Sequence, residues 1–215
     1  MFSIEAKEAL IENLAPFLEA YGFKYREEPP GLCFWKARDG DSIDFFFQVL
    51  SGGDYLISPF HISISKVEEV LHSLFQKFEI SAKPITVSYQ LGETMMAMHQ
   101  LRKEGAPIPA VMEKFKSSFK AQMYQRCLDL LDIDEVYNVL GDYYKPKEKG
   151  ITMGGSGIPR RLRFLTICML CNDLENFDVT LRKFNEDPRA YESSPENHKE
   201  LFEEGIKLIR RIKVG

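Results

Sequence analysis

Hydrophobic and polar residues alternate with a period of two between Leu32 and Ser65, which predicts a β-sheet in this part of the chain. Two strands, Leu32–Ala37 and Ile43–Leu50, flank a turn in which Asp39-Gly40 tolerates the positive φ of a tight hairpin. A third strand is expected from Tyr55 to Ser65. Its apolar residues alternate with polar ones, namely Phe60, Ile62 and Ile64 with His61, Ser63 and Ser65. This strand is therefore expected to have one dry and one polar face.

Apolar residues at helical spacing dominate outside this sheet. A first helix precedes the sheet and is expected to kink or break at Pro16, because proline removes a backbone N–H and clashes with the preceding turn. A second helix follows Ser65, which is expected to form a Ser-x-x-Glu capping box with Glu68. A fourth strand is predicted from Ile85 to Leu91, and from Ala110 onward the spacing is helical throughout.

The order of these elements predicts the fold class. One helix, three strands, one helix, one strand and then helices alone indicate an α+β fold. We expect a small, mainly antiparallel sheet of about four strands flanked by helices, followed by an all-helical C-terminal half. The polar stretches Tyr25–Gly31 and Lys145–Gly157 are expected to be connections. The expected domains are a sheet-containing region, 1–106, and a helical region, 107–215, and one continuous domain is the alternative.

Composition narrows the range of functions. The chain has 215 residues, of which 44% are hydrophobic and 28% charged, which is typical of a soluble globular protein. Its formal net charge of -4 provides no positive field for a polyanion, so we expect no nucleic-acid partner. No apolar run approaches the roughly 18 residues of a membrane helix. The start of the chain does not resemble a secretion signal, so we expect no membrane association and a cytoplasmic location. Composition does not indicate the oligomeric state.

The segment from Gly154 to Arg163 is the strongest candidate for a ligand site. Small residues allow backbone N–H groups to approach an anion, and a helix with basic residues in its first turns follows. The candidate residues are Gly155, Ser156, Gly157, Arg160, Arg161 and Arg163. A P-loop would need a preceding strand, which the sequence does not predict here, and a lysine, which the segment lacks. The alternative is a flexible connector followed by basic surface residues, whose partners would be Asp132, Asp134 or Glu135.

The Cys168-x-x-Cys171 pair lies at the end of a strongly apolar predicted helix. A redox pair needs an exposed thiol at a helix start, and a zinc site needs two further ligands nearby in space. The other cysteines and the four histidines are scattered along the sequence. We therefore expect reduced, mostly buried thiols, no metal site and no cofactor.

The polar face of the predicted sheet is the second candidate surface. Asp44 and Gln48 lie on the middle strand and His61 and Ser63 on the third. A nucleophile and base pair is not indicated, because alternate strand residues lie almost 7 Å apart and no serine stands in a strained turn. No complete catalytic set is recognised, and we expect these four residues to face a partner if one docks on the sheet.

The first 90 residues resemble small uncharacterised bacterial α+β proteins. The resemblance rests on a helix ending in Tyr21-Gly22-Phe23-Lys24, followed by aromatic strands around Phe34-Trp35 and Ile43 to Gln48. Some such families are associated with immunity against toxins, so the resemblance implies a binding role and identifies no catalytic residue. The long helical C-terminal half departs from it.

These observations lead to three functional hypotheses. The first is a non-enzymatic protein-binding module, immunity-like or adaptor-like, in which an acidic chain inhibits a more basic partner. The second is an enzyme that handles a small molecule or nucleotide phosphate with the segment from Gly154 to Arg163. The third is a structural subunit, which would self-associate.

Overall fold

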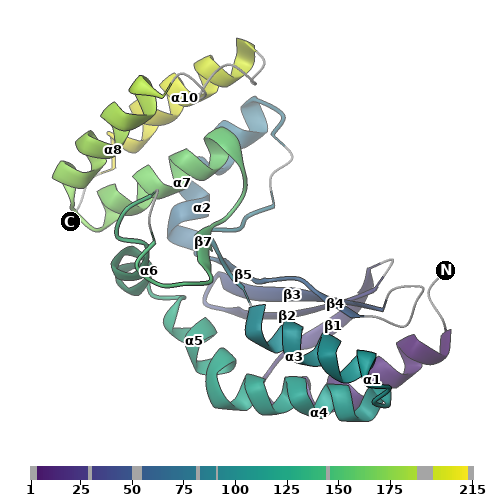
Figure 1. The fold of residues 1–215 in the computed structure, drawn as a ribbon. Coiled ribbons are helices and arrows are strands. Elements are labelled where there is room, and N and C mark those ends of the chain that lie inside the picture. The colour runs from purple at the N-terminus through teal and green to yellow at the C-terminus, as the bar shows by residue number, and fades with distance from the viewer. Residues whose placement is uncertain are drawn as a thin grey trace. The chain divides into compact units, whose positions relative to one another are not determined.

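The computed structural model describes residues 4–28, 31–49, 55–80, 83–90, 92–143, 146–187 and 196–212 (Figure 1). The chain forms two compact units, Met1–Ile62 with Tyr89–Leu130 and Ser63–Ser88 with Leu131–Gly215. Each unit combines two separate stretches of sequence. These units are defined by contacts within the chain and not by independent folding. The predicted division into the domains 1–106 and 107–215 therefore stays a prediction.

The first unit contains an antiparallel group of strands. They are β1 (Lys24–Glu28), β2 (Gly31–Arg38), β3 (Asp41–Val49), β4 (Tyr55–Ile57) and β5 (Phe60–Ser63), whose last residue belongs to the second unit. The strand order is β1-β2-β3-β5, and β4 also pairs with β3. Asp39 and Gly40 both have positive φ, 52° and 92°, which confirms the predicted tight hairpin. The predicted third strand is divided into β4 and β5 by Ser58 and Pro59.

Helices cover one face of these strands. They are α1 (Ile4–Glu19), α3 (Gly92–Lys103), α4 (Ile108–Ser118), a π-helical turn η1 (Phe119–Met123) and α5 (Tyr124–Asp129). Figure 1 shows α1, α3 and α4 on the same side of β1 to β4. The aromatic rings of that face are packed edge to face or tilted against rings of α4 and η1, and the buried members are Phe23, Phe34, Phe45, Phe47, Phe60, Phe115 and Phe119.

The second unit is centred on one buried helix. Its elements are α2 (Ser65–Lys77), β6 (Val87–Tyr89), α6 (Ile133–Leu140), β7 (Ile151–Met153), α7 (Gly157–Leu170), α8 (Leu174–Glu186) and α10 (Glu196–Ile209). α7 is packed against α2, α8 and α10. The part of α7 from Leu162 to Met169 is buried at every position, as expected of the strongly apolar helix that was predicted to end at the Cys168-x-x-Cys171 pair.

The α+β class is confirmed, and the predicted number of four strands was too low. β1 was missed because its side chains are mostly exposed and show no apolar alternation. β7 was missed because three residues are too few to show a period, and it makes the predicted all-helical C-terminal half wrong.

The predicted capping box was wrong. α2 is preceded by Ile64, which makes no side-chain cap, and the Glu68 side chain is not used in a capping box. Of the two outcomes expected at Pro16, the break does not occur, because α1 continues through Pro16 to Glu19. Within the described part of the chain, no helix has both the length and the apolar character needed to cross a membrane.

Candidate functional site

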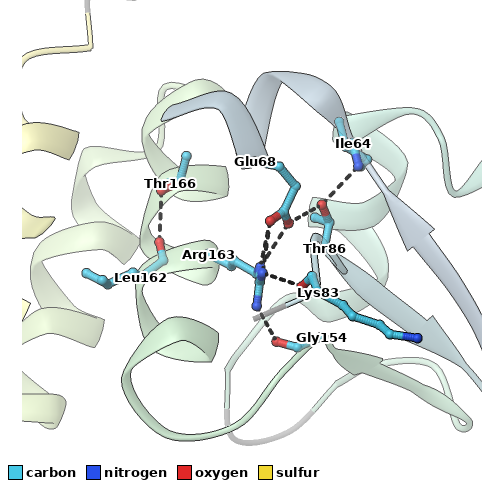
Figure 2. A network of polar contacts seen from close by, with 8 residues as sticks. All are labelled: Ile64, Glu68, Lys83, Thr86, Gly154, Leu162, Arg163 and Thr166. Atoms are coloured by element: carbon cyan, nitrogen blue, oxygen red, sulfur yellow. Dashed lines mark hydrogen bonds and ion pairs between the residues drawn. The ribbon is translucent and has the colours of Figure 1, made fainter. Parts of the chain in front are cut away.

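Arg163, one of the candidate anion ligands, is buried in an ion pair. Its side chain is 0% exposed and that of its partner Glu68 is 10% exposed. Arg163 Nε donates to the two carboxylate oxygens of Glu68 at 2.8 and 3.1 Å, and Nη2 donates to Oε2 at 2.9 Å. Figure 2 shows this forked contact between α7 and α2. The geometry is that of a planar guanidinium bound by a carboxylate, which is among the strongest polar contacts in proteins.

The remaining donors and acceptors of this pair connect two further segments. Arg163 Nη2 donates to the carbonyl of Lys83 at 3.0 Å, and Nη1 donates to that of Gly154 at 3.4 Å. Thr86 Oγ1 donates to Glu68 at 2.8 Å and accepts from the N–H of Ile64 at 2.9 Å. All three guanidinium nitrogens of Arg163 therefore have partners inside the protein, and the network joins α2, α7, the residues before β6 and the residue after β7 (Figure 2).

The glycines of the candidate loop are explained by this packing. A Cβ on Gly154 would lie 1.9 Å from the carbonyl oxygen of Ile85, and the N–H of Gly154 donates to the carbonyl of Thr86. Gly155 has φ +79°, and a Cβ there would lie 2.7 Å from Nη1 of Arg163. Glycine is required at both positions because the backbone passes close to its neighbours. The two glycines are therefore explained by the close approach of Ile85 to Gly154 and of Arg163 to Gly155.

Arg160 and Arg161 lie in the first turns of α7 and also contact protein groups. Arg161 Nη2 lies 3.1 Å from Asp187 Oδ2, and its guanidinium lies 4.8 Å from the ring centre of Phe184. The guanidinium of Arg160 lies 5.4 Å from the ring centre of Tyr143. Ser156 precedes α7 without a side-chain cap, and Gly157 has φ +55°. Among the candidate arginines, Arg163 pairs with Glu68 and Arg161 with Asp187, and not with the acidic residues 132–135 that the sequence suggested.

The outer face of the β1-β2-β3-β5 sheet carries a row of polar and aromatic side chains. Strand pairing places Lys24 opposite Trp35 and Trp35 opposite Asp44. The Lys24 ammonium lies 5.5 Å from the ring centre of Trp35, and Asp44 Oδ1 lies 3.9 Å from His61 Nδ1. The side chains of Asp44 and His61 are 36% and 23% exposed, and Trp35 is half-buried. The row therefore crosses four strands on the face opposite the helices.

A second row lies beside the first. Arg26, Cys33 and Phe46 are aligned across β1, β2 and β3. Phe46 is half-buried, and its ring lies over Gly31, where a Cβ would approach the ring to 2.9 Å. Gln48 on β3 is also half-buried.

The structure brings together only part of the predicted sheet surface. Asp44 and His61 are in contact, and Gln48 lies four residues from Asp44 on the same face of β3. Ser63 is 8% exposed, which leaves little of it for a partner. Sequence reasoning did not include Trp35 and Phe46, the two aromatic residues of this face, among the candidates. The available signal was that Trp35, the only tryptophan of the chain, alternates with the buried Phe34.

The Cys-x-x-Cys pair is located at the C-terminal end of α7. Cys168 is buried and Cys171 is half-buried, and burial raises the pKa of each thiol to about 12. Both thiols are therefore protonated at neutral pH, which is unlike a redox-active pair. Among the described residues, no group of three or more His, Cys, Asp or Glu side chains could hold a metal ion.

A polar cluster lies near these thiols. Tyr137 donates to the carboxylate of Asp173, and Asn176 Nδ2 donates to Tyr137 Oη at 3.1 Å. Burial raises the pKa of Tyr137 to about 12. The backbone N–H of Asn176, followed by the Tyr137 hydroxyl, lowers the pKa of Asp173. Asp173 also caps α8, so the cluster fixes the junction between α6 and α8.

No family model, no curated protein and no solved structure matches this chain.

Proposed function

We propose that this chain is a non-enzymatic protein-binding module and that its partner docks on the outer face of the β1-β2-β3-β5 sheet. The observation that carries the proposal is the row Lys24, Trp35, Asp44 and His61, which crosses this face. The opposite face is already occupied by α1, α3 and α4. The outer face keeps aromatic surface, on Trp35 and Phe46, that a partner would bury.

The chemistry of the row supports recognition of a protein. Tryptophan is enriched among the residues that dominate binding energies, because it buries a large area with few rotatable bonds. Trp35 and Phe46 are half-buried in the free chain, so a partner could remove their remaining surface from water. Asp44, Gln48 and His61 surround them with polar groups, which is the arrangement of an apolar centre with a polar rim.

The charge of the chain suggests the form that this binding takes. The net charge of -4 would speed association with a basic protein, because complementary fields steer diffusional encounters. We therefore propose, more specifically, that the chain is an acidic inhibitor of a basic partner. The resemblance of the first 90 residues to proteins associated with immunity against toxins is in keeping with this role. Asp44 is the carboxylate within the row that such a partner would meet.

The proposal is tested by affinity capture from the native cells with paired variants. Trp35→Ala and Asp44→Lys change the row, whereas Met96→Ala and Glu12→Lys change an exposed apolar and an exposed acidic residue on α3 and α1. A partner that is retained by the two control variants and lost by the two row variants supports the proposal. A partner held equally by all four variants, or turnover of a metabolite that depends on another part of the chain, contradicts it.

The rival role, phosphate handling by the segment from Gly154 to Arg163, receives less support. Arg163 and Arg161 already bind the carboxylates of Glu68 and Asp187, and two glycines of the loop are explained by backbone packing. Binding of a phosphate compound that is lost in Arg160→Ala and retained in the sheet variants would restore this role.

A further inference from the structure

A groove between α2 and α10 lies in the second unit, away from the candidate loop in sequence. It encloses about 430 Å³ and is lined by Ser73, Leu74, Lys77, Glu204, Lys207, Leu208 and Arg211. Leu74 is buried and Leu208 half-buried, so they form an apolar floor, and the charged residues stand around it. This volume lies within the range of small-molecule sites.

The groove carries more positive than negative charge. Three of its lining residues are cations and one is a carboxylate. Lys77 Nζ lies 2.7 and 2.6 Å from the two oxygens of Glu204, so that one lysine is neutralised. Lys207 and Arg211 are exposed, and within the described parts of the chain neither pairs with a carboxylate. Two positive charges are left uncompensated beside a hollow with an apolar floor.

We infer that the α2–α10 groove binds a small organic anion that carries two or more phosphate groups. Lys207 and Arg211 would bind the phosphates, since ammonium and guanidinium groups form charge-assisted hydrogen bonds with phosphate oxygens. The hydroxyl of Ser73 is a further donor in the lining. Leu74 and Leu208 would contact the apolar part of the ligand. Because two positive charges, those of Lys207 and Arg211, are uncompensated, the ligand is expected to carry at least two negative charges.

This assignment places anion recognition on different residues from those that the sequence suggested. In the segment from Gly154 to Arg163, Arg163 has 0% exposure and binds Glu68. In the groove, Lys207 lies in the last turn of α10 and Arg211 lies two residues after its end; both are exposed and line the same hollow. The inference does not depend on the proposed protein partner, because the sheet surface belongs to the other unit.

The test is isothermal titration of the whole chain with inorganic pyrophosphate and, separately, with ATP, both without divalent metal. Arg211→Ala and Lys207→Ala are compared with Arg210→Ala. Arg210 is the matched control, because it neighbours Arg211 and is 58% exposed but pairs with Asp178 at 3.7 Å outside the groove. All three changes are at exposed positions, and circular dichroism of each variant confirms that the fold is kept.

We expect saturable binding of both probes by the wild-type chain, weakened about tenfold or more in each groove variant and unchanged in Arg210→Ala. Higher salt should weaken binding, because the contact is mainly electrostatic. Tighter binding of ATP than of pyrophosphate would support the apolar floor as a contact. The inference is overturned by no saturation at about 10 mM pyrophosphate or by equal weakening of binding in Arg210→Ala. Sheet-face variants that still bind pyrophosphate would separate this result from the proposed partner surface.

Discussion

Replacement of Arg163 by methionine is expected to be among the most destabilising changes in the second unit. The change removes the guanidinium and leaves the Glu68 carboxylate, 10% exposed, with Thr86 as its remaining hydrogen-bond donor in the network. The carbonyls of Lys83 and Gly154 lose a donor at the same time. An unpaired charge at a buried position lowers the free energy of unfolding far more than the loss of an ion pair exposed to water.

The expected size follows from this geometry. Breaking a buried ion pair by removal of one partner costs about 3–5 kcal/mol. Glu68→Gln should cost a similar amount, because it leaves the fully buried Arg163 charge without a carboxylate. The double variant Arg163→Met with Glu68→Gln contains no buried charge, and the glutamine can still accept from Thr86. Its loss should therefore be smaller than the sum of the two single losses, by about 2 kcal/mol.

The assay is urea unfolding of the whole chain followed by circular dichroism, with the free energy of unfolding taken by linear extrapolation to zero urea. Lys183→Met is the control, because its ion pair with Asp142 joins side chains that are 46% and 47% exposed. That variant should lose less than about 1 kcal/mol. Single variants of the buried pair that also lose less than about 1 kcal/mol, or losses that simply add, would refute the argument.

Three further predictions follow from the same geometry. Gly155→Ala should destabilise the chain by about 1–3 kcal/mol in urea unfolding, because residue 155 has a φ of +79° and its Cβ would lie 2.7 Å from Arg163. The control is Gly92→Ala, whose Cβ would meet no neighbour within 4 Å, and this variant should be neutral or stabilising. The lowered pKa of Asp173 stabilises the fold above its ordinary value of 3.8, and this stability is lost as the pH falls through the lowered pKa. Melting curves between about pH 5 and pH 2 should therefore depend less on pH in Asp173→Asn than in the wild type. Cys171 should react slowly with an aromatic disulfide reagent at pH 8, because burial raises its pKa to about 12, and rapid reaction of the folded chain would contradict this.

Sequence reasoning located the candidate surfaces better than it interpreted them. The alternation in β5 correctly placed Phe60 and Ile62 inward and His61 on the other face. The same reasoning treated Arg163 as a ligand for an anion, because an arginine that follows glycines in the sequence can equally bind an anion or a carboxylate of the protein. Its partner Glu68 lies 95 residues away in the sequence, and no local pattern could have joined them.

The sequence by itself determined the α+β class, the Asp39-Gly40 hairpin and the buried centre of α7, because each depends on periodicity or on backbone preferences within a few residues. Only the tertiary structure decided which charges are neutralised and which stay available. It buried Arg163 against Glu68, left Lys207 and Arg211 beside a hollow, and aligned Lys24, Trp35 and Asp44 across three strands. The physical reason is that desolvation and pairing of charges depend on distances between segments, and those distances are fixed by packing of the chain and not by its local order.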